Sequence, residues 1–232
     1  MNNENWTKDE IKILQKYYPA IGARVKDFLS NRSESSLRHK ASRLGIPYKD
    51  LAMGKVGFFD IESSQLQADF GFMYSWYIKT LGEEEYFHAV VTQDEIREGI
   101  LDKRIVEELV EALRQYKRIY TFYGSRFDLP FCRTRALVHK LKFVPYGLVE
   151  HRDLWYLVRR ILKLHRNRLE CVCDALDIKG KTHLEPKTWV LANTGNAGAL
   201  EYIAEHNRMD VIILERVFNR LQEFEAKTRR YM

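Results

Sequence analysis

The spacing of hydrophobic residues divides the chain into a short helical part and a longer part in which strands alternate with helices. In the first fifty residues, apolar side chains recur every three or four positions in three segments, as expected for amphipathic helices. These segments are residues 9–18, 23–29 and 34–44. Pro19 and Gly45 follow the first and third segments, and both residue types commonly end helices. The pattern predicts a small three-helix domain over residues 1–50.

From residue 55 onward, short runs of β-branched and aromatic residues alternate with helical segments. Strands are expected at residues 56–62, 70–79, 86–91, 118–123 and 148–151, and helices at 93–116 with a break at Gly99, 128–141, 153–162, 168–176 and 197–223. The polar turn at 81–85 joins the second and third strands into an antiparallel hairpin. Residues 180–196 are polar and are expected to be irregular. This order predicts an α/β domain over residues 55–232.

Length and composition agree with a globular protein of this organisation. The chain of 232 residues, 45% of them hydrophobic, is long enough for one α/β domain and a small companion. No segment approaches the roughly 20 consecutive apolar residues that span a bilayer. The polar start of the chain lacks the basic and apolar regions of a signal peptide. We therefore expect a soluble, cytoplasmic protein with no membrane partner.

Basic residues are concentrated near the N-terminus. The first fifty residues hold ten Lys and Arg against six Asp and Glu, and so contribute +4 of the net charge of +6. On the third expected helix, a helical projection places a basic, hydroxyl-rich face opposite Leu37. This face comprises Ser35, Arg38, His39, Lys40, Ser42 and Arg43. Nucleic acid is a natural partner for such a face, and a solvated lysine-rich surface is the alternative.

The cysteines do not indicate a disulfide framework. Cys132, Cys171 and Cys173 are odd in number and accompany no secretory signal, which favours a reducing compartment. A zinc site would have to combine Cys171 and Cys173 with His165 and His183. The two cysteines lie two positions apart on an expected helix and therefore point in different directions. Ordinary packing is the preferred interpretation.

Asp60 and Glu62 interrupt an otherwise apolar strand. Because side chains alternate along a strand, both project from the same face. Burying carboxylates in such a strand is strongly unfavourable unless a cation compensates their charge. A divalent metal ion is the simplest such cation, and a pair of salt bridges at the strand end is the alternative.

Two further acidic positions have ordinary explanations when each is taken alone. Asp128 begins a helix directly after a strand, where α/β proteins collect functional groups and where an aspartate is also an ordinary helix cap. His206 and Asp210 are four positions apart on the last expected helix, so they share a face. The apolar positions of that helix place this pair near the edge of the core, where a solvated face is as good an interpretation as a site.

Taken together, these acidic motifs resemble those of the DEDD superfamily of 3′-to-5′ exonucleases on the RNase H-like fold. The motifs are Phe59-Asp60-Ile61-Glu62, Tyr123-Gly124-Ser125-Arg126-Phe127-Asp128 and His206-Asn207-Arg208-Met209-Asp210. The stand-alone exonucleases related to the proofreading domain of family B polymerases are closest in appearance, and Gly180-Lys181-Thr182 is similar to them as well. The resemblance implies an RNase H-like mixed sheet flanked by helices and a metal-dependent 3′-5′ exonuclease.

The resemblance also implies a mechanism. Two divalent metal ions, Mg²⁺ or Mn²⁺, would be held by Asp60, Glu62, Asp128 and Asp210, with Asp60 between them. Glu62 and Asp210 would hold the ion that activates water, and Asp128 would help to fix the other. His206 would accept the proton of the water. This histidine departs from the family pattern. In the family, either a tyrosine with three intervening residues or a histidine with four intervening residues precedes the aspartate. Here a histidine with three intervening residues precedes Asp210.

Substrate contacts are expected from Arg126, Lys181 and Trp189, although each has an ordinary structural interpretation as well. Residues 5–46 resemble a Myb/SANT-like helix-turn-helix module, which carries Trp6, Tyr17-Tyr18-Pro19 and Lys40-Ala41-Ser42-Arg43-Leu44-Gly45. The resemblance implies DNA contact through the third helix, although related modules bind proteins. Its candidate contacts are Arg32, Arg38, His39, Lys40 and Arg43.

The favoured substrate is therefore DNA rather than RNA, as single strands or 3′ ends. Two other functions remain open from sequence. One is a DNA-binding adaptor whose RNase H-like domain has no activity, and the other is a structure-selective endonuclease that uses the same acidic residues.

Overall fold

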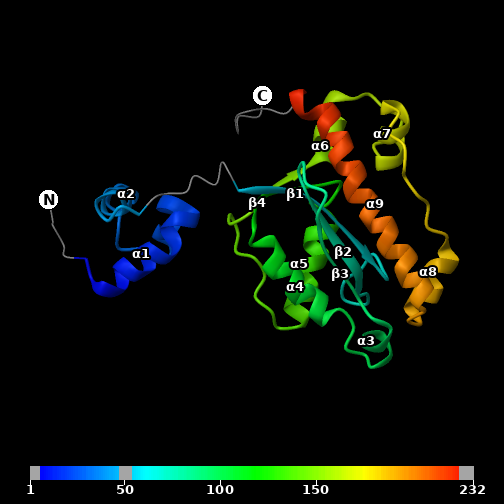
Figure 1. The fold of residues 1–232 in the computed structure, drawn as a ribbon, viewed down its shortest axis with the longest axis horizontal. Coiled ribbons are helices and arrows are strands. Elements are labelled where there is room, and N and C mark those ends of the chain that lie inside the picture. Colours follow the sequence, from blue (N-terminus) through cyan, green and yellow to red (C-terminus); the bar gives the residue numbers. More distant parts are fainter. Residues whose placement is uncertain (1–5, 47–53, 225–232) are drawn as a thin grey trace. The chain divides into compact units, whose positions relative to one another are not determined.

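The computed structural model of the protein describes residues 6–46 and 54–224. The chain divides into two compact units, Met1–Gly54 and Lys55–Met232 (Figure 1). Each unit buries hydrophobic side chains of its own. The smaller unit is therefore a separate body of secondary structure rather than an extension of the sheet.

The smaller unit contains α1 (Lys8–Ile21), the 3₁₀-helix η1 (Gly22–Asp27) and α2 (Glu34–Arg43). The first helix continues beyond the end expected at Pro19. The second segment, expected as a helix over residues 23–29, is a 3₁₀-helix of six residues that buries Val25. The third helix is confirmed, and its N-cap Ser33 accepts a hydrogen bond from the Ser36 N–H at 3.2 Å.

Arg32 lies inside this unit rather than on its basic face. Its side chain is only 8% exposed, and its Nε and Nη2 donate to the two carboxylate oxygens of Glu10 at 2.8 and 2.9 Å. The guanidinium also lies 4.7 Å from the centre of the Trp6 ring. Arg32 thus connects the start of α1 to the residues before α2, and Arg38, His39 and Arg43 remain exposed on α2.

The larger unit is built on a five-stranded sheet in the order β3-β2-β1-β4-β5. The strands are β1 (Lys55–Ser63), β2 (Met73–Thr80), β3 (Tyr86–Val90), β4 (Tyr116–Thr121) and β5 (Glu150–Asp153). The expected antiparallel hairpin is confirmed, because β2 pairs antiparallel with both β1 and β3. In contrast, β1, β4 and β5 run parallel. The carboxyl ends of these three strands therefore lie at one edge of a mixed sheet.

The helices of this unit are α3 (Gln93–Arg97), α4 (Lys103–Leu113), α5 (Asp128–Val138), α6 (Leu154–Ile161), α7 (Leu169–Leu176), α8 (Pro186–Asn193) and α9 (Ala197–Leu221), and the 3₁₀-helix η3 (Gln222–Phe224) follows. The expected break at Gly99 is confirmed, with a positive φ of 72°. The expectation of an irregular segment at 180–196 was wrong over α8. Pro186 can occupy the first turn of a helix without losing a hydrogen bond, and Ala192 is buried.

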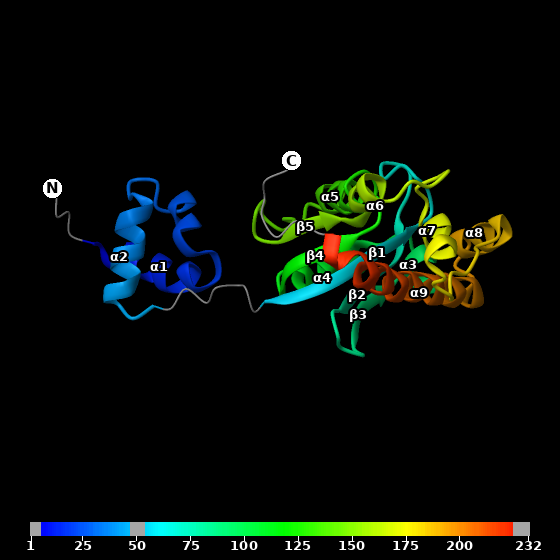
Figure 2. The same cartoon turned by 90° about the horizontal axis from the view of Figure 1, so that it is seen from above.

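The sheet lies between α4 and α5 on one side and α9 on the other (Figures 1 and 2). Along β1, Phe59 and Ile61 belong to the core that includes α4 and α5, whereas Phe58 belongs to the core that includes α6, α7 and most of α9. Since side chains alternate along a strand, Asp60 and Glu62 leave the same face as Phe58. Both carboxylates are thereby directed toward the α9 side of the sheet.

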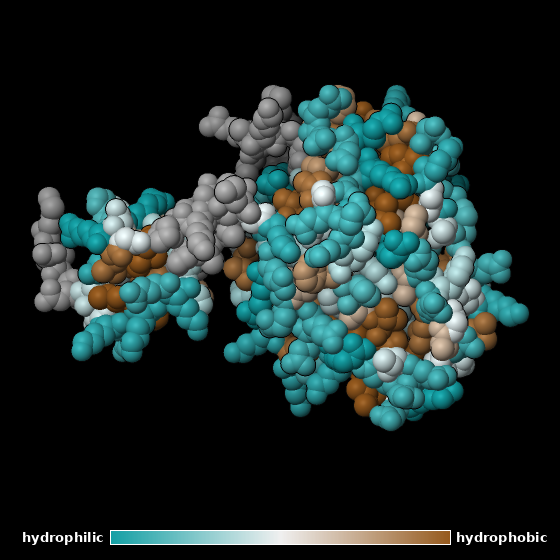
Figure 3. Space-filling view, in the orientation of Figure 1, coloured by the Kyte–Doolittle hydropathy of each residue, from teal (hydrophilic) through white to brown (hydrophobic). Residues whose placement is uncertain are grey.

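Within the part of the chain that the structure describes, no helix combines the length and apolar character needed to cross a membrane. On the face of the larger unit seen in Figure 3, hydrophobic residues form separate patches between hydrophilic ones. Such a mixture is usual for the surface of a folded protein.

A buried ionic network fixes the side of the sheet away from α9. Asp102, which has no exposed surface, precedes α4 and accepts hydrogen bonds from Arg135 on α5 at 2.7 and 2.8 Å. The same carboxylate accepts the Met73 N–H at 2.8 Å and lies 2.7 Å from His139 Nε2. One carboxylate thus joins α4, α5 and β2.

We expect Asp102→Ala to lower the free energy of unfolding by about 3–5 kcal/mol, because it leaves the Arg135 guanidinium buried without its counter-ion. Chemical denaturation followed by circular dichroism measures this loss. The matched control is Glu108→Ala, which removes an exposed partner of Arg104 on the same helix α4 and should cost less than about 1 kcal/mol. Equal, small losses in both variants would contradict a structural role for the network.

Candidate active site

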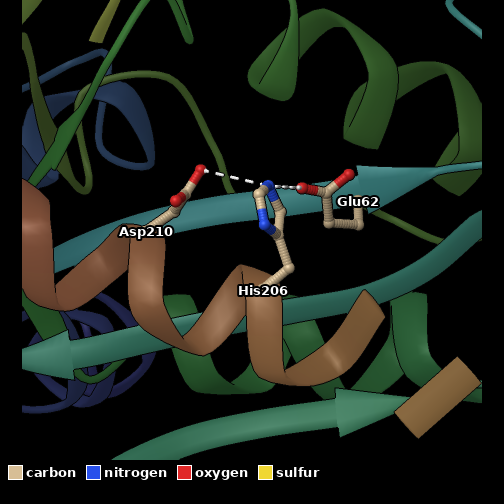
Figure 4. Close-up of side chains that lie close together, drawn as sticks. All are labelled: Glu62, His206 and Asp210. Atoms are coloured by element: carbon tan, nitrogen blue, oxygen red, sulfur yellow. Dashed lines mark ion pairs between the residues drawn. The ribbon is translucent and has the colours of Figure 1, made fainter. Parts of the chain in front are cut away.

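The structure brings together the catalytic residues expected from sequence. Glu62 on β1 and the α9 residues His206 and Asp210 each offer an oxygen or nitrogen atom within 4.8 Å of the others. The imidazole of His206 lies between the two carboxylates (Figure 4), with its Nε2 3.6 Å from Glu62 Oε1 and 3.8 Å from Asp210 Oδ2. The spacing of four residues on α9 places the histidine and the aspartate on one face, over β1.

Asp128 joins this group from the first turn of α5. Its Oδ1 accepts a hydrogen bond from the backbone N–H of Ile61 at 3.1 Å. Ile61 is the residue between Asp60 and Glu62 on β1, so this bond holds the Asp128 carboxylate against that part of the strand. The cap position of α5 is Phe127, which makes no side-chain cap. Asp128 therefore does not serve as an N-cap, which was the ordinary interpretation of this residue taken alone.

Asn207 is a site residue that sequence reasoning missed. It is fully buried, its Nδ2 donates to Asp60 Oδ2 at 2.6 Å, and its Oδ1 accepts from Ser75 Oγ at 3.1 Å. The amide therefore orients Asp60 and ties α9 to β1 and β2. A sequence signal was present, because a residue three positions before Asp210 shares its helical face and a polar side chain there is out of place in a core.

The segment between α7 and α8 also reaches the site. Lys181 Nζ forms an ion pair with Asp210 Oδ2, and Thr182 Oγ1 forms a hydrogen bond with His206 Nδ1. Lys181 was expected to contact phosphate, and the structure places it against the carboxylate of Asp210 instead. The other oxygen of that carboxylate, Asp210 Oδ1, is buried and has no hydrogen-bond partner among the described residues.

Crowding of these buried and half-buried carboxylates perturbs their ionisation. Burial, and then the charges of Asp128 and Asp210, hold the pKa of Asp60 well above its usual range. Burial, followed by the charge of Asp210, raises the pKa of Glu62 to about 8. Burial also raises the pKa of Asp128 to about 7. Lys181 opposes the effect at Asp60 and Glu62 without cancelling it, so the site favours additional positive charge.

His206 responds to burial in the opposite direction. Burial lowers the pKa of His206 to about 4, so its imidazole is neutral at neutral pH. A neutral imidazole can accept a proton, as a general base must. Its Nδ1 is engaged by Thr182, which leaves Nε2 facing the carboxylates.

The residues present fit a hard divalent cation. Carboxylate oxygens are the ligands that Mg²⁺ and Mn²⁺ prefer in proteins. A buried carboxylate oxygen without a partner, such as Asp210 Oδ1, is costly, and a bound cation would satisfy it. The carboxylate ligands of the site and the unpaired Asp210 Oδ1 therefore both fit a bound divalent cation.

The remaining sequence candidates are Arg126, Trp189 and the cysteines. Arg126 is exposed in the loop between β4 and α5. Trp189 on α8 is partly buried and stacks on Tyr74 with ring centres 5.8 Å apart. Cys173 is buried in the core, and no group of three or more metal-binding side chains among the described residues includes a cysteine. Cys132 is buried as well, whereas Cys171 is half-buried and its Sγ lies 3.8 Å from His165 Nε2.

Comparison with known proteins identifies one family. A family model for the RNase H superfamily matches residues 57–222. Among curated proteins, the chain is similar to a DNA polymerase of Methanocaldococcus jannaschii, at 29% identity over 31% of this chain and 6% of the polymerase. The match is thus confined to a small part of a much longer protein.

Among solved structures, the chain is similar to the family B DNA polymerase of the hyperthermophilic archaeon Pyrobaculum calidifontis. The TM-score is 0.60 at 15% sequence identity, over 74% of this chain and 25% of the polymerase. At this level of identity the likeness concerns the fold. It supports the expected α/β architecture with a mixed sheet flanked by helices.

We expect the metal-free protein to lose stability as pH rises from about 6.5 to about 8. The folded state raises the pKa of Glu62 from 4.5 to about 8, so it binds this proton more tightly than the unfolded chain does, and the free energy of unfolding falls as pH rises through that interval. His206 has the opposite effect, but its contribution is complete above its ordinary pKa of 6.5.

Urea denaturation in EDTA at a series of pH values measures this slope. Glu62→Gln removes the titrating group and should flatten the slope relative to the unaltered protein. Parallel pH profiles for the two proteins would contradict the assigned cause.

Proposed function

The chain belongs to the RNase H superfamily, and on this premise we propose that it is a metal-dependent nuclease that hydrolyses DNA from the 3′ end. The observation that carries the proposal is the gathering of Asp60, Glu62, Asp128 and Asp210 at one edge of the sheet, where their mutual repulsion favours a bound cation. A fold alone does not establish an activity, so the proposal rests on this site.

Each site residue has a role in this proposal. When bound, two Mg²⁺ or Mn²⁺ ions would stabilise the charge that develops on the phosphate and leaving oxygens. Asp60, Glu62, Asp128 and Asp210 would hold these ions, and Asn207 keeps Asp60 in position. The neutral imidazole of His206 would accept the proton of the attacking water.

The similar proteins and the acidic motifs support a polarity of cleavage and a substrate. The chain is similar to parts of two archaeal DNA polymerases, and its acidic motifs resemble those of the proofreading exonucleases of family B polymerases. These resemblances favour a 3′-5′ exonuclease and DNA over RNA. The smaller unit, with its exposed basic α2, would add a helix-turn-helix contact with duplex DNA.

We expect Asp60→Asn to leave the fold intact and to reduce cleavage in Mg²⁺ or Mn²⁺ by about a thousandfold or more, because metal-ion stabilisation of the transition state is worth several kcal/mol. Rates on a labelled single strand, with and without EDTA, measure the loss. Asp69→Asn, the same change at an exposed aspartate, is the matched control. Undiminished cleavage by a clean Asp60→Asn preparation would contradict the assigned site.

The same assay separates the alternatives. Strands labelled at the 5′ end should shorten stepwise from a free 3′ end and resist cleavage when that end is blocked. Internal cuts in the blocked strand would indicate an endonuclease. The absence of any metal-dependent cleavage would indicate a non-catalytic DNA-binding protein.

We expect the combined substitution of Arg38, Lys40 and Arg43 by Ala to weaken binding to duplex DNA and to reduce the slope of log affinity against log salt by about 2–3, because each lost phosphate contact removes about 0.9. Binding isotherms at several salt concentrations measure both effects. The control is the substitution of Lys8, Lys12 and Lys16 on α1, which removes the same charge. An unchanged slope in the α2 variant would instead favour a protein-binding role for this unit.

A further inference from the structure

Three aromatic side chains meet where β4 and β5 end. The rings of Tyr123 and Trp155 lie 5.3 Å apart at 67°, and those of Trp155 and Tyr156 lie 5.0 Å apart at 84°. Tyr123 is 45% exposed and Tyr156 is 47% exposed. We refer to Tyr123, Trp155 and Tyr156 as the aromatic platform. Leu154 and Val158 bury the opposite face of α6 in the core, so α6 turns its aromatic side outward.

Two arginines accompany the aromatic platform. The Arg159 guanidinium lies 5.2 Å from the centre of the Trp155 ring, one helical turn along α6. Arg126 is exposed, and its side chain hydrogen-bonds with that of Tyr156. Exposed rings with adjacent guanidinium groups suit a ligand that has both flat bases and phosphates.

The backbone at the aromatic platform is strained at Tyr123 and is held in place by hydrogen bonds to one carboxylate. Tyr123 has a positive φ of 70°, a conformation that bulky side chains rarely adopt, and its half-exposed ring is not required by the core. Asp153 maintains it: this carboxylate accepts the N–H groups of Tyr123, Ser125 and Trp155 at 2.8, 2.9 and 3.0 Å. One side chain therefore fixes both the loop after β4 and the start of α6.

The aromatic platform lies at the same sheet edge as the candidate active site. The loop that carries Tyr123 and Arg126 leads directly into Asp128, whose carboxylate is bonded to β1. Because β1, β4 and β5 are parallel, their carboxyl ends bring Asp60, Asp128 and the aromatic platform to one edge.

We infer that the aromatic platform binds single-stranded nucleic acid, stacking unpaired bases on the exposed rings of Tyr123 and Tyr156 while Arg126 and Arg159 contact the phosphates. Bases in a duplex are already stacked on one another, so exposed rings favour an unpaired strand. The inference deepens the proposed function, on which it rests, by assigning the unpaired strand a binding surface at the sheet edge that carries the carboxylates.

Binding can be measured separately from cleavage. A short fluorescent oligothymidylate is titrated with the full chain in EDTA. Tyr156→Ala and Arg159→Ala should each raise Kd about fivefold or more, and Tyr156→Phe, which keeps the ring, should retain most of the affinity. The matched controls are Tyr146→Ala, at a fully exposed tyrosine, and Arg114→Ala, at an exposed arginine that directly follows α4, neither of which should change Kd.

The outcomes distinguish this inference from the proposed function. Unchanged Kd values in Tyr156→Ala and Arg159→Ala, an equal loss in the two controls, or no binding of the oligothymidylate by the unaltered chain would each overturn the inference. Melting temperatures show whether each variant folds, and Tyr156→Leu and Arg159→Gln, which keep side-chain bulk without the ring or the charge, give the result should an alanine variant unfold. Selective loss of binding in a protein that cleaves nothing would sustain the aromatic platform and reject the nuclease.

Discussion

The crowding of the half-buried Asp60 and Glu62 with the buried Asp128 and Asp210 at one edge of the sheet is the constraint around which the larger unit is organised, because negative charges held close together with little access to water oppose folding. The surrounding elements supply what the carboxylates need. Asn207 and the Ile61 N–H donate to two of them, and Lys181 pairs with a third. One oxygen of Asp210 remains without a partner among the described residues, which agrees with a site built to receive a cation.

The helix α9 both packs into the core and carries residues of the candidate active site. Val211, Leu214 and Val217 pack into the core beside β1 and β4, and this packing sets how closely α9 approaches the sheet. His206 and Asp210 lie on the adjacent face of α9, close to Glu62, and no loop separates them from the part of the helix that packs in the core. Catalytic groups on packed helices and strands are positioned more firmly than groups on loops. The remote network centred on Asp102 contributes to the same rigidity from the other side of the sheet.

Parallel pairing of β1, β4 and β5 explains why the candidate active site and the aromatic platform lie at the same edge of the sheet. Each of these strands ends at the same edge, so the residues that follow them converge although they are far apart in the chain. Asp153 is central to this convergence, since it connects the loop leading to Asp128 with the helix that carries Trp155. A single strand resting on the aromatic platform would therefore have the carboxylates close by.

The sequence by itself determined the faces on which side chains lie, and tertiary structure decided which partners they meet. Alternation along β1 predicted that Asp60 and Glu62 share a face, and the four-residue spacing on α9 predicted the same for His206 and Asp210; these are local regularities of strand and helix. The pairing of Lys181 with Asp210, the burial of Arg32 against Glu10 and the bond from Asn207 to Asp60 were not predictable in this way. They join residues distant in the chain, whose approach depends on how the elements pack, and the periodicity of one element carries no information about the element packed against it.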